Sequence, residues 1–412
     1  MKYDGIVIGG GAAGIMAAIT AAQNGQKVLI LERNEKLGRK LLITGKGRCN
    51  VTNDCSAQEV LQNIPRNGRF LYSAMDAFPP AKIMELLSQN GCELKTERGN
   101  RVFPISDKSF SVLDSLVALL RKHRVDVKTG RVTKITTQEG NVSGVMTEKN
   151  TYEASWVVLA TGGKSYPLTG STGDGYHMAA ALGHTIVAPE GSLVPLETAG
   201  EDAQRMQGLS LRNVDVKLIN EKKKVLYRDF GELLFTHFGV SGPTVLSASA
   251  HMKGKCQLIL DLKPALDEGK LDSRILRDLE MYQNRAMENA LTGLLPRSMI
   301  PVILDRIGVD PQLPAHSFTK QHRRALVETL KGFRLEITGK RPVEEAIITS
   351  GGVKVSEVNP KTMESKLIPG LYFAGEILDC DAYTGGFNLQ IAWATGRIAG
   401  ECAAAYLAAR SE

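Results

Sequence analysis

The sequence predicts an α/β protein built on a parallel sheet, with an inserted segment of different character in its second half. Three observations indicate this class. The chain opens with a strand, a glycine-rich turn, a helix and a second strand, in that order. Near its end, another apolar strand is followed by glycine, an acid and a glycine-led helix. Between them, from about residue 192, short strand-like runs replace the alternation of strands and helices, which favours an insertion into the sheet domain.

The first 33 residues predict a dinucleotide-binding unit. A strand over 3–8 precedes Gly9, Gly11 and Gly14, which fit G-x-G-x-x-G, and a helical run and a strand over 27–31 follow. These glycines permit a tight turn, close approach of the backbone to a pyrophosphate, and close packing of helix on strand. Glu32 closes the second strand, where a carboxylate can accept hydrogen bonds from ribose hydroxyls. A glycine-rich turn without a ligand is the alternative, and it leaves the offset of Glu32 unexplained.

A loop rich in glycine, cations and amides follows, over residues 33–53. It contains Arg39-Lys40 and then Thr44-Gly45-Lys46-Gly47-Arg48-Cys49-Asn50. Backbone donors and guanidinium groups in such a mixture can surround phosphate and ribose. The alternative interpretation is a solvated basic loop.

Later elements return to the same sheet. We expect a strand over 156–160 ending at Thr161-Gly162-Gly163, and ligands lie off the carboxyl ends of strands in open α/β sheets. Asp174 then stands where it could cap a helix reaching 182. In the last expected helix, Ala392, Gly396 and Gly400 form a stripe of small residues that favours close packing.

Composition limits the ligands, metal sites and cellular location that we expect. The 412 residues carry a net charge of +7, which suits anionic ligands, although the charges are dispersed as on a solvated surface. None of the six cysteines forms C-x-x-C, and no metal-binding His/Cys spacing occurs. We therefore expect free thiols, no metal and a cytoplasmic protein. No apolar run approaches the roughly 20 residues of a membrane span.

Several motifs together resemble a known family. They are the Gly9–Glu32 unit, the loop 44–50, Gly231-Glu232-Leu233-Leu234-Phe235-Thr236-His237, the strand end Phe373-Ala374-Gly375-Glu376, and Gly385-Gly386-Phe387-Asn388-Leu389-Gln390. The chain is similar over nearly its whole length to bacterial NAD(P)/FAD-dependent oxidoreductases, a family that includes proteins named as bile-acid 4,6-reductases and aminoacetone oxidases.

The resemblance implies an α/β fold: a Rossmann-like two-dinucleotide-binding FAD domain with an inserted β-barrel domain and a small helical sub-domain. The expected boundaries are 1–191 plus 350–412 for the FAD domain, 192–264 plus 333–349 for the barrel, and 265–332 for the helical sub-domain.

The motifs and the resemblance together name the expected cofactor-binding residues. These are Gly9, Gly11, Ala13, Gly14, Glu32, Arg33, Arg39, Lys40, Gly45, Lys46, Gly47, Arg48, Asn50, Val132, Ala160, Thr161, Gly162, Gly375, Glu376, Gly386, Phe387, Asn388 and Leu389. The usual acid of such C-terminal motifs is Asp directly after Gly. Here Glu376 takes that place with Asp379 nearby, so both carboxylates stay candidates for the ribityl chain.

The function expected from the resemblance is reduction of an activated double bond in a small organic substrate, with NADH or NADPH as a transient electron donor. A flavin amine oxidase using oxygen is the first alternative. An FAD-containing RNA-binding or RNA-modifying protein is the second. We expect a small-molecule substrate rather than nucleic acid, and the sequence leaves the oligomeric state open. The candidate catalytic residues are His237 as proton donor, with Tyr383 and Asn388 as polar contacts to substrate.

Overall fold

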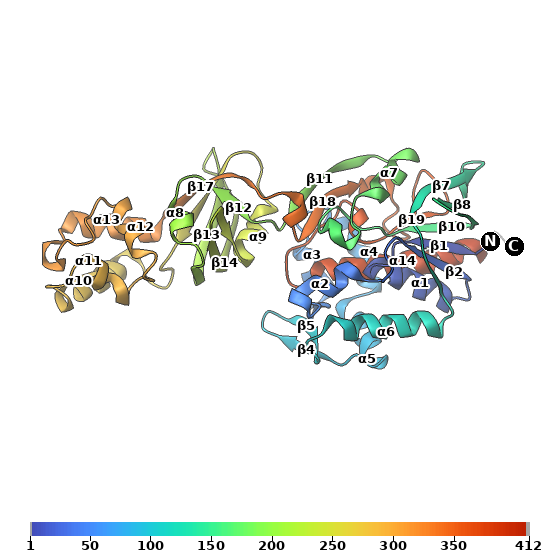
Figure 1. The fold of residues 1–412 in the computed structure, drawn as a ribbon, viewed down its shortest axis with the longest axis horizontal. Helices are drawn as coiled ribbons and strands as arrows, with labels where there is room; N and C mark the ends of the chain where they lie inside the picture. Colours follow the sequence, from blue (N-terminus) through green and yellow to red (C-terminus); the bar gives the residue numbers. More distant parts are fainter. Residues whose placement is uncertain (1, 409–412) are drawn as a thin grey trace. The chain divides into compact units, whose positions relative to one another are not determined.

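A computed structural model describes residues 2–408 of the chain in two compact units (Figure 1). The first, here called the sheet unit, comprises the chain up to Ser192 and from Val343 onward. The second, the insert unit, comprises Leu193–Pro342. Each unit buries a hydrophobic core of its own. The α/β class and the inserted barrel are both as predicted.

A five-stranded parallel sheet forms the centre of the sheet unit. The strands run in the order β19 (Leu371–Phe373), β10 (Trp156–Leu159), β1 (Gly5–Ile8), β2 (Val28–Glu32) and β6 (Asp126–Thr129). The pairs are all parallel. Every residue of β1, β10 and β19 is buried, as expected for strands covered on both faces.

Two helices from opposite ends of the chain pack together against this sheet: α1 (Ala12–Gln23) and α14 (Phe387–Ala408). A Cβ added at Gly396 or Gly400 would stand 2.3 Å from the carbonyl oxygens of Ala13 and Ala17, respectively. The stripe of small residues therefore lets the two backbones meet, as the sequence predicted.

The remaining elements of the sheet unit surround this core. The helices are α2 (Arg39–Gly47), α3 (Ala57–Gln62), α4 (Tyr72–Ala77), α5 (Pro80–Gln89), α6 (Ser109–Lys122) and α7 (Asp174–Ala181). The strands are β3 (Thr52–Asn53), β4 (Leu94–Glu97), β5 (Arg101–Pro104), β7 (Val132–Gln138), β8 (Asn141–Thr147), β9 (Thr151–Glu153), β11 (Ile186–Ser192) and β18 (Ile348–Val353). Strands β7, β8 and β9 form an antiparallel sheet in which β8 packs on β10.

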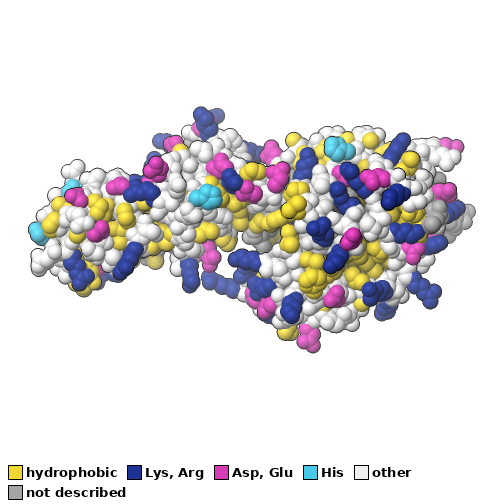
Figure 2. Space-filling model, in the orientation of Figure 1, with side chains coloured by type: hydrophobic (Ala, Val, Ile, Leu, Met, Phe, Trp, Pro, Cys, Tyr) yellow, Lys and Arg dark blue, Asp and Glu magenta, His cyan; other side chains and the backbone are white. Residues whose placement is uncertain are grey.

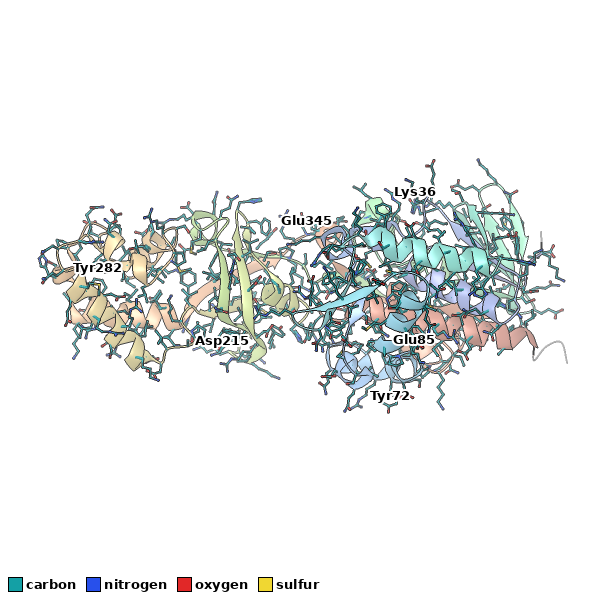
Figure 3. The ribbon with its side chains drawn as sticks, turned by 90° about the horizontal axis from the view of Figure 1, so that it is seen from below. Lys36, Tyr72, Glu85, Asp215, Tyr282 and Glu345 are labelled. Atoms are coloured by element: carbon teal, nitrogen blue, oxygen red, sulfur yellow. The ribbon has the colours of Figure 1, made fainter. Side chains whose placement is uncertain are left out.

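The insert unit contains a closed six-stranded barrel in the order β12-β15-β14-β13-β16-β17. Its strands are β12 (Leu196–Thr198), β13 (Ser210–Asn220), β14 (Val225–Thr236), β15 (Gly239–Ser241), β16 (Cys256–Asp261) and β17 (Phe333–Lys340). Its helices are α8 (Asp202–Arg205), α9 (Pro243–Ser249), α10 (Glu268–Met281), α11 (Met287–Ala290), α12 (Ile300–Arg306) and α13 (Lys320–Lys331). Helices α10–α13 come between β16 and β17; Figure 3 labels Asp215 on the barrel and Tyr282 beside α10.

The observed units differ from the expected boundaries in three ways, the smallest being that Ser192, the last residue of β11, belongs to the sheet unit. Residues 343–349 belong to the sheet unit, not to the barrel, because β18 begins at Ile348 and pairs with β11. The expected helical sub-domain, 265–332, shares one continuous core with the barrel strands, so it does not separate from the barrel as a compact unit.

Candidate active site

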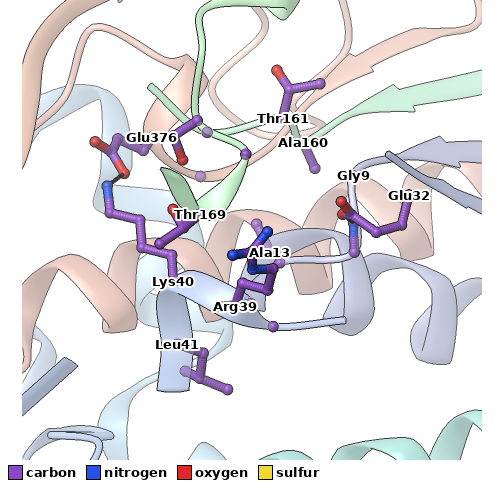
Figure 4. A pocket seen from close by; sticks show the side chains of 18 of the residues that line it. Gly9, Ala13, Glu32, Arg39, Lys40, Leu41, Ala160, Thr161, Thr169 and Glu376 are labelled. Atoms are coloured by element: carbon purple, nitrogen blue, oxygen red, sulfur yellow. Dashed lines mark hydrogen bonds and ion pairs between the residues drawn. The ribbon is translucent and has the colours of Figure 1, made fainter. Parts of the chain in front are cut away.

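A pocket of the sheet unit opens at the carboxyl ends of β1, β2, β10 and β19 (Figure 4). Fifteen of the predicted cofactor residues line it: Gly9, Gly11, Ala13, Glu32, Arg33, Arg39, Lys40, Val132, Ala160, Thr161, Gly162, Gly375, Glu376, Asn388 and Leu389. The sheet collects them because parallel strands present their carboxyl ends at one edge.

The three glycines of the first turn do three different things. Gly9 has φ +103°, a conformation that side chains rarely adopt. A Cβ at Gly14 would lie 1.9 Å from the carbonyl oxygen of Gly9, so this glycine presses α1 onto the turn. A Cβ at Gly11 would meet nothing within 4 Å, so the backbone there faces open space. Gly11 is also the N-cap of α1, where no side chain caps the helix. The first N–H groups of α1 are thus available to a phosphate.

Glu32 stands beside this turn at the end of β2. Its carboxylate accepts from the Gly10 N–H at 2.8 Å, and from the backbone N–H and side-chain Nδ2 of Asn34 at 2.8 and 2.7 Å. Asn34 also accepts from the Arg39 guanidinium at 2.9 Å. Asn34 lines the pocket and was missed by the sequence analysis. Its only signal was its position two residues after the acid.

A second polar group forms where four chain segments meet. The Lys40 Nζ donates to Glu376 Oε2 at 2.6 Å and to Ser165 Oγ at 2.7 Å, and Figure 4 marks the contact between Lys40 and Glu376. Glu376 Oε1 accepts from the Thr349 N–H at 2.9 Å. Glu376 lines the pocket, whereas Asp379 does not and instead pairs with Arg66. Of the two candidate acids, Glu376 is therefore the one that faces the cavity.

A third polar cluster includes Arg33, Arg131 and Asp174 of the pocket lining, and the sequence analysis anticipated only part of it. Asp174 accepts from Arg131 at 2.9 Å and from Arg33 at 3.2 Å, and Thr172 accepts from Arg33 at 2.6 Å. The expected capping role of Asp174 is wrong: Gly173 is the N-cap of α7, and no side chain caps that helix. The Asp174 carboxylate instead accepts hydrogen bonds from Arg33 and Arg131. Their positions, far apart in sequence, explain why a local motif did not reveal the cluster.

Eight predicted cofactor residues do not line the pocket: Gly14, Gly45, Lys46, Gly47, Arg48, Asn50, Gly386 and Phe387. Arg48 pairs with Glu97 at 2.9 Å and lies 3.9 Å from the ring centre of Phe103. Asn50, with its amide turned to satisfy both of its ends, accepts from the Gly386 N–H at 3.0 Å. A Cβ at Gly386 would lie 2.3 Å from the Thr52 carbonyl oxygen. Asn50 and Gly386 therefore join the loop before α14 to the segment 50–52, without lining the pocket themselves.

The three predicted catalytic residues lie in different surroundings. Asn388 lines the pocket, and its amide both donates to and accepts from the backbone of Ala382 at 2.8 Å. It thereby positions the loop that carries Tyr383, which is half-buried. His237 belongs to the insert unit, where it is exposed and its ring lies edge-on to Phe238. Its role as proton donor stays a prediction.

Three further features of the described residues concern a thiol, metal ligands and helix length. Burial raises the pKa of the Cys49 thiol to about 12, so this cysteine of the predicted cofactor loop stays protonated near neutral pH. Between residues 2 and 408, no cluster of three or more His, Cys, Asp or Glu side chains could hold a metal ion. Within the same range, no helix combines the length and the apolar character needed to cross a bilayer.

The pocket fits FAD. Uncapped helix N–H groups and the open approach at Gly11 suit the pyrophosphate, and Glu32 suits the adenosine ribose. Glu376 and the start of α14 lie at the edge supplied by β19. Fold and site together define an FAD-dependent oxidoreductase.

Comparison with known proteins gives the family. The HI0933-like protein Rossmann domain matches residues 3–402, and the chain belongs to that family. It is 32% identical over 97% of its length to the 3-dehydro-bile acid delta(4,6)-reductase of Clostridium scindens, of which 98% is covered. It is 30% identical over its whole length to the ribosomal RNA dihydrouridine synthase of Escherichia coli K12, of which 99% is covered.

Solved structures agree on the fold alone. The E. coli quinol fumarate reductase FrdA superposes with a TM-score of 0.52 at 18% identity, covering 100% of this chain and 71% of that one. Mycobacterium smegmatis Sdh1 gives the same TM-score and identity, with 99% and 69% covered.

Proposed function

We propose that this protein reduces a carbon–carbon double bond conjugated to a carbonyl group, with NADH or NADPH as the electron donor. The observation that carries the proposal is that two full-length relatives share this bond type. A delta(4,6)-reductase of a 3-dehydro bile acid acts on double bonds conjugated to a ketone. A dihydrouridine synthase saturates the uracil double bond that is conjugated to a carbonyl. The substrates differ, whereas the bond is common to both.

Bound FAD would supply the hydride chemistry, and the chain supplies binding and electrostatics. Glu32, Asn34 and Arg39 form one hydrogen-bonded group at the β2 end of the pocket, and Lys40 and Glu376 form another. Helix α14 begins at Phe387, and two residues of its first turn, Asn388 and Leu389, line the cavity. N–H groups at a helix start favour negative charge, so this turn would stabilise the anionic reduced form of the cofactor.

Anaerobic stopped-flow experiments test the proposed reaction. We expect NADH or NADPH to bleach the flavin absorbance quickly, and an enone such as a 3-keto-4,6-diene steroid to restore it. Reduction by an amine and reoxidation by oxygen, with no response to either nicotinamide nucleotide, would show the oxidase alternative instead.

The predicted catalytic residues can be tested in the same assay. If His237 donates the proton that accompanies hydride transfer, His237→Ala should slow reoxidation by the enone about a hundredfold and leave reduction by NAD(P)H unchanged, because general acids contribute roughly 10²–10⁴. Tyr383→Phe provides the matched test of the half-buried phenol. Unchanged rates in both half-reactions would remove the residue concerned from the mechanism.

The second candidate function is reduction of the same type of double bond in a uracil base within RNA. Relatives named as ribosomal RNA dihydrouridine synthases, from E. coli and Haemophilus influenzae, cover 100% and 95% of this chain, and both matches therefore include the insert unit. The charge distribution favours this candidate. Residues 193–342 contain 23 Lys and Arg against 18 Asp and Glu, so five of the seven net positive charges fall on the insert unit. The sequence analysis ranked nucleic acid below a small molecule.

Direct analysis of RNA separates the two settings. We expect dihydrouridine to form when the FAD-loaded protein and NADH or NADPH are mixed with unmodified bacterial ribosomal RNA, measured by nucleoside mass spectrometry. Rapid turnover of a free steroid enone with no dihydrouridine formed would favour a small-molecule substrate.

A further inference from the structure

Five lysines crowd one end of the barrel in the insert unit. Lys222, Lys223 and Lys224 form the turn between β13 and β14, and Lys253 and Lys255 lie in the loop before β16. All five side chains are exposed. We call this group the lysine tip. Figure 2 shows Lys and Arg side chains standing out from the surface around the barrel.

Strand pairing brings the two loops of the lysine tip together. Asn220, the last residue of β13, is paired with Cys256, the first residue of β16. The β13–β14 turn therefore starts next to the residue that follows Lys255. Two loops separated by about thirty residues of sequence thus present their lysines on one edge of the barrel.

Local hydrogen bonds fix the backbone of both loops. Asn220 accepts from the Lys223 N–H at 2.9 Å through its carbonyl and from the Lys224 N–H at 2.9 Å through its side chain. The Cys256 thiol lies 3.7 Å from the Lys253 carbonyl oxygen and donates to it. His251, two residues before Lys253, stacks on Tyr227 of β14 with ring centres 5.0 Å apart. The backbone of both loops is therefore braced, which fixes the points from which the exposed lysine side chains extend.

The five lysines of the tip are exposed and lack acidic partners among the described residues, a combination that suits an anionic ligand. Among residues 2–408, no carboxylate forms an ion pair with any of the five ammonium groups. Glu221 is the acid within the turn itself. Two other cations of the insert unit do have carboxylate partners: Arg228 of β14 pairs with Asp215 at 2.6 Å, and Lys331 of α13 pairs with Asp261. Unpaired like charges repel one another, a cost that binding to a polyanion would remove.

We propose that the lysine tip binds the phosphate backbone of RNA. The inference rests on the second candidate function above, since a uracil in RNA must reach the enzyme attached to a chain of phosphates. A run of closely spaced ammonium groups matches successive phosphates and releases their counterions. Lysine acts here as a point charge without base specificity, so the tip would hold the polymer without selecting its sequence.

Equilibrium binding tests the tip. The FAD-loaded protein is titrated against a fluorescein-labelled fragment of bacterial ribosomal RNA at several salt concentrations. The triple variant K222Q/K223Q/K224Q should bind about tenfold more weakly, and the slope of log affinity against log salt should fall by about two, because each lost phosphate contact removes roughly 0.7–0.9. The matched control is K122Q/K149Q/K361Q, which removes three exposed lysines from the sheet unit; it should change binding less than about twofold.

Each contrary outcome has a distinct meaning. Equal weakening in both triple variants would show that net charge, and not the lysine tip, governs binding, and would overturn the proposal. It would also be overturned if the native protein did not bind the RNA, or if phosphatidylglycerol vesicles competed better than RNA.

Activity measurements keep this proposal separate from the reductase proposal. The tip variant should retain flavin reduction by NADH or NADPH and turnover of a free enone at native rates. A native protein that binds RNA through the tip but reduces no conjugated double bond would contradict the proposed reaction and leave the tip intact. A native protein that reduces the enone but shows no difference between the two triple variants would do the reverse.

Discussion

The turn after β1 in the sheet unit depends on its backbone, whereas the lysine tip of the insert unit depends on exposed side chains. At the turn after β1, Gly9, Gly11 and Gly14 set the path of the chain, and helix N–H groups face the pocket. At the barrel edge, five lysines project from two braced turns. A backbone site demands particular dihedral angles and close contacts. A side-chain site demands only charge and spacing, and it tolerates substitution of its neighbours.

The largest expected effect compares two glycines of the same turn. Gly14→Ala places a methyl group 1.9 Å from the Gly9 carbonyl oxygen, so the turn must move and the sheet unit should lose stability and FAD together. Gly11→Ala meets no atom within 4 Å and should fold normally, yet bind FAD poorly because its methyl group stands where the pyrophosphate approaches. Thermal unfolding and flavin content measure the two effects. Equal behaviour of the two variants would contradict the assigned roles.

The second prediction concerns the independence of the two cores. Phe235 is fully buried in the barrel, and Phe235→Ala should destabilise the insert unit by about 3–5 kcal/mol. The sheet unit should still hold FAD, so unfolding should divide into two transitions, with only the later one shifted by added FAD. Circular dichroism and flavin fluorescence followed on the same sample would record this. Simultaneous loss of flavin and barrel structure would show that the two units fold as one.

A smaller effect is expected from the acid at the end of β2. Glu32→Ala removes the acceptor of three hydrogen bonds and should weaken FAD binding about ten- to a hundredfold, since bonds to charged groups contribute roughly 1.5–3 kcal/mol. The control is Glu336→Ala, an exposed acid on β17 of the barrel. Isothermal titration with FAD measures both. A similar loss of affinity in the control would mean that overall charge, and not Glu32 itself, controls retention.

The smallest expected effect is a pH dependence that belongs to the sheet unit. His184 is buried against Phe373 and bonds Ser365 at 2.9 Å, and burial lowers its pKa below the usual value of 6.5. The unfolded chain then binds the extra proton first, so stability should fall as pH drops below about 6.5 toward the lowered folded pKa. His184→Gln should flatten this slope in urea titrations at pH 5.5 and 7.5. His316→Gln, at an exposed position in the insert unit, should leave it unchanged.

The sequence predicted the parts of the site that are encoded within one short stretch better than the parts that form by tertiary contacts. The turn after β1 is encoded by residues within one short stretch, so glycine spacing and Glu32 were sufficient to find it. Arg48 looked equally suitable by composition, but it is engaged by Glu97 and Asp107, 49 and 59 residues further along. Only tertiary folding shows that its charge is already paired.

Residues that meet across the fold were the hardest to predict. Lys40, Ser165, Thr349 and Glu376 converge from four segments, and no local pattern links Ser165 or Thr349 to the cofactor. The lysine tip was equally hidden. The sequence shows Lys222–Lys224 as a charged turn, and only the pairing of β13 with β16 adds the second loop. From sequence alone, a run of charged residues is interpreted as solvated surface. Only the folded structure shows which other charged groups lie next to it.

The packing of α14 on α1 has a consequence for the order of synthesis. The ribosome completes every barrel strand, β12 to β17, before it reaches β19 and α14. The insert unit can therefore close while the sheet unit still lacks an edge strand and the helix whose Gly396 and Gly400 meet the backbone of α1. Until β19 and α14 emerge, the nascent chain contains all the strands of the barrel but a sheet that is still incomplete. The part of the pocket lined by Gly375, Glu376, Asn388 and Leu389 is therefore completed only after the barrel.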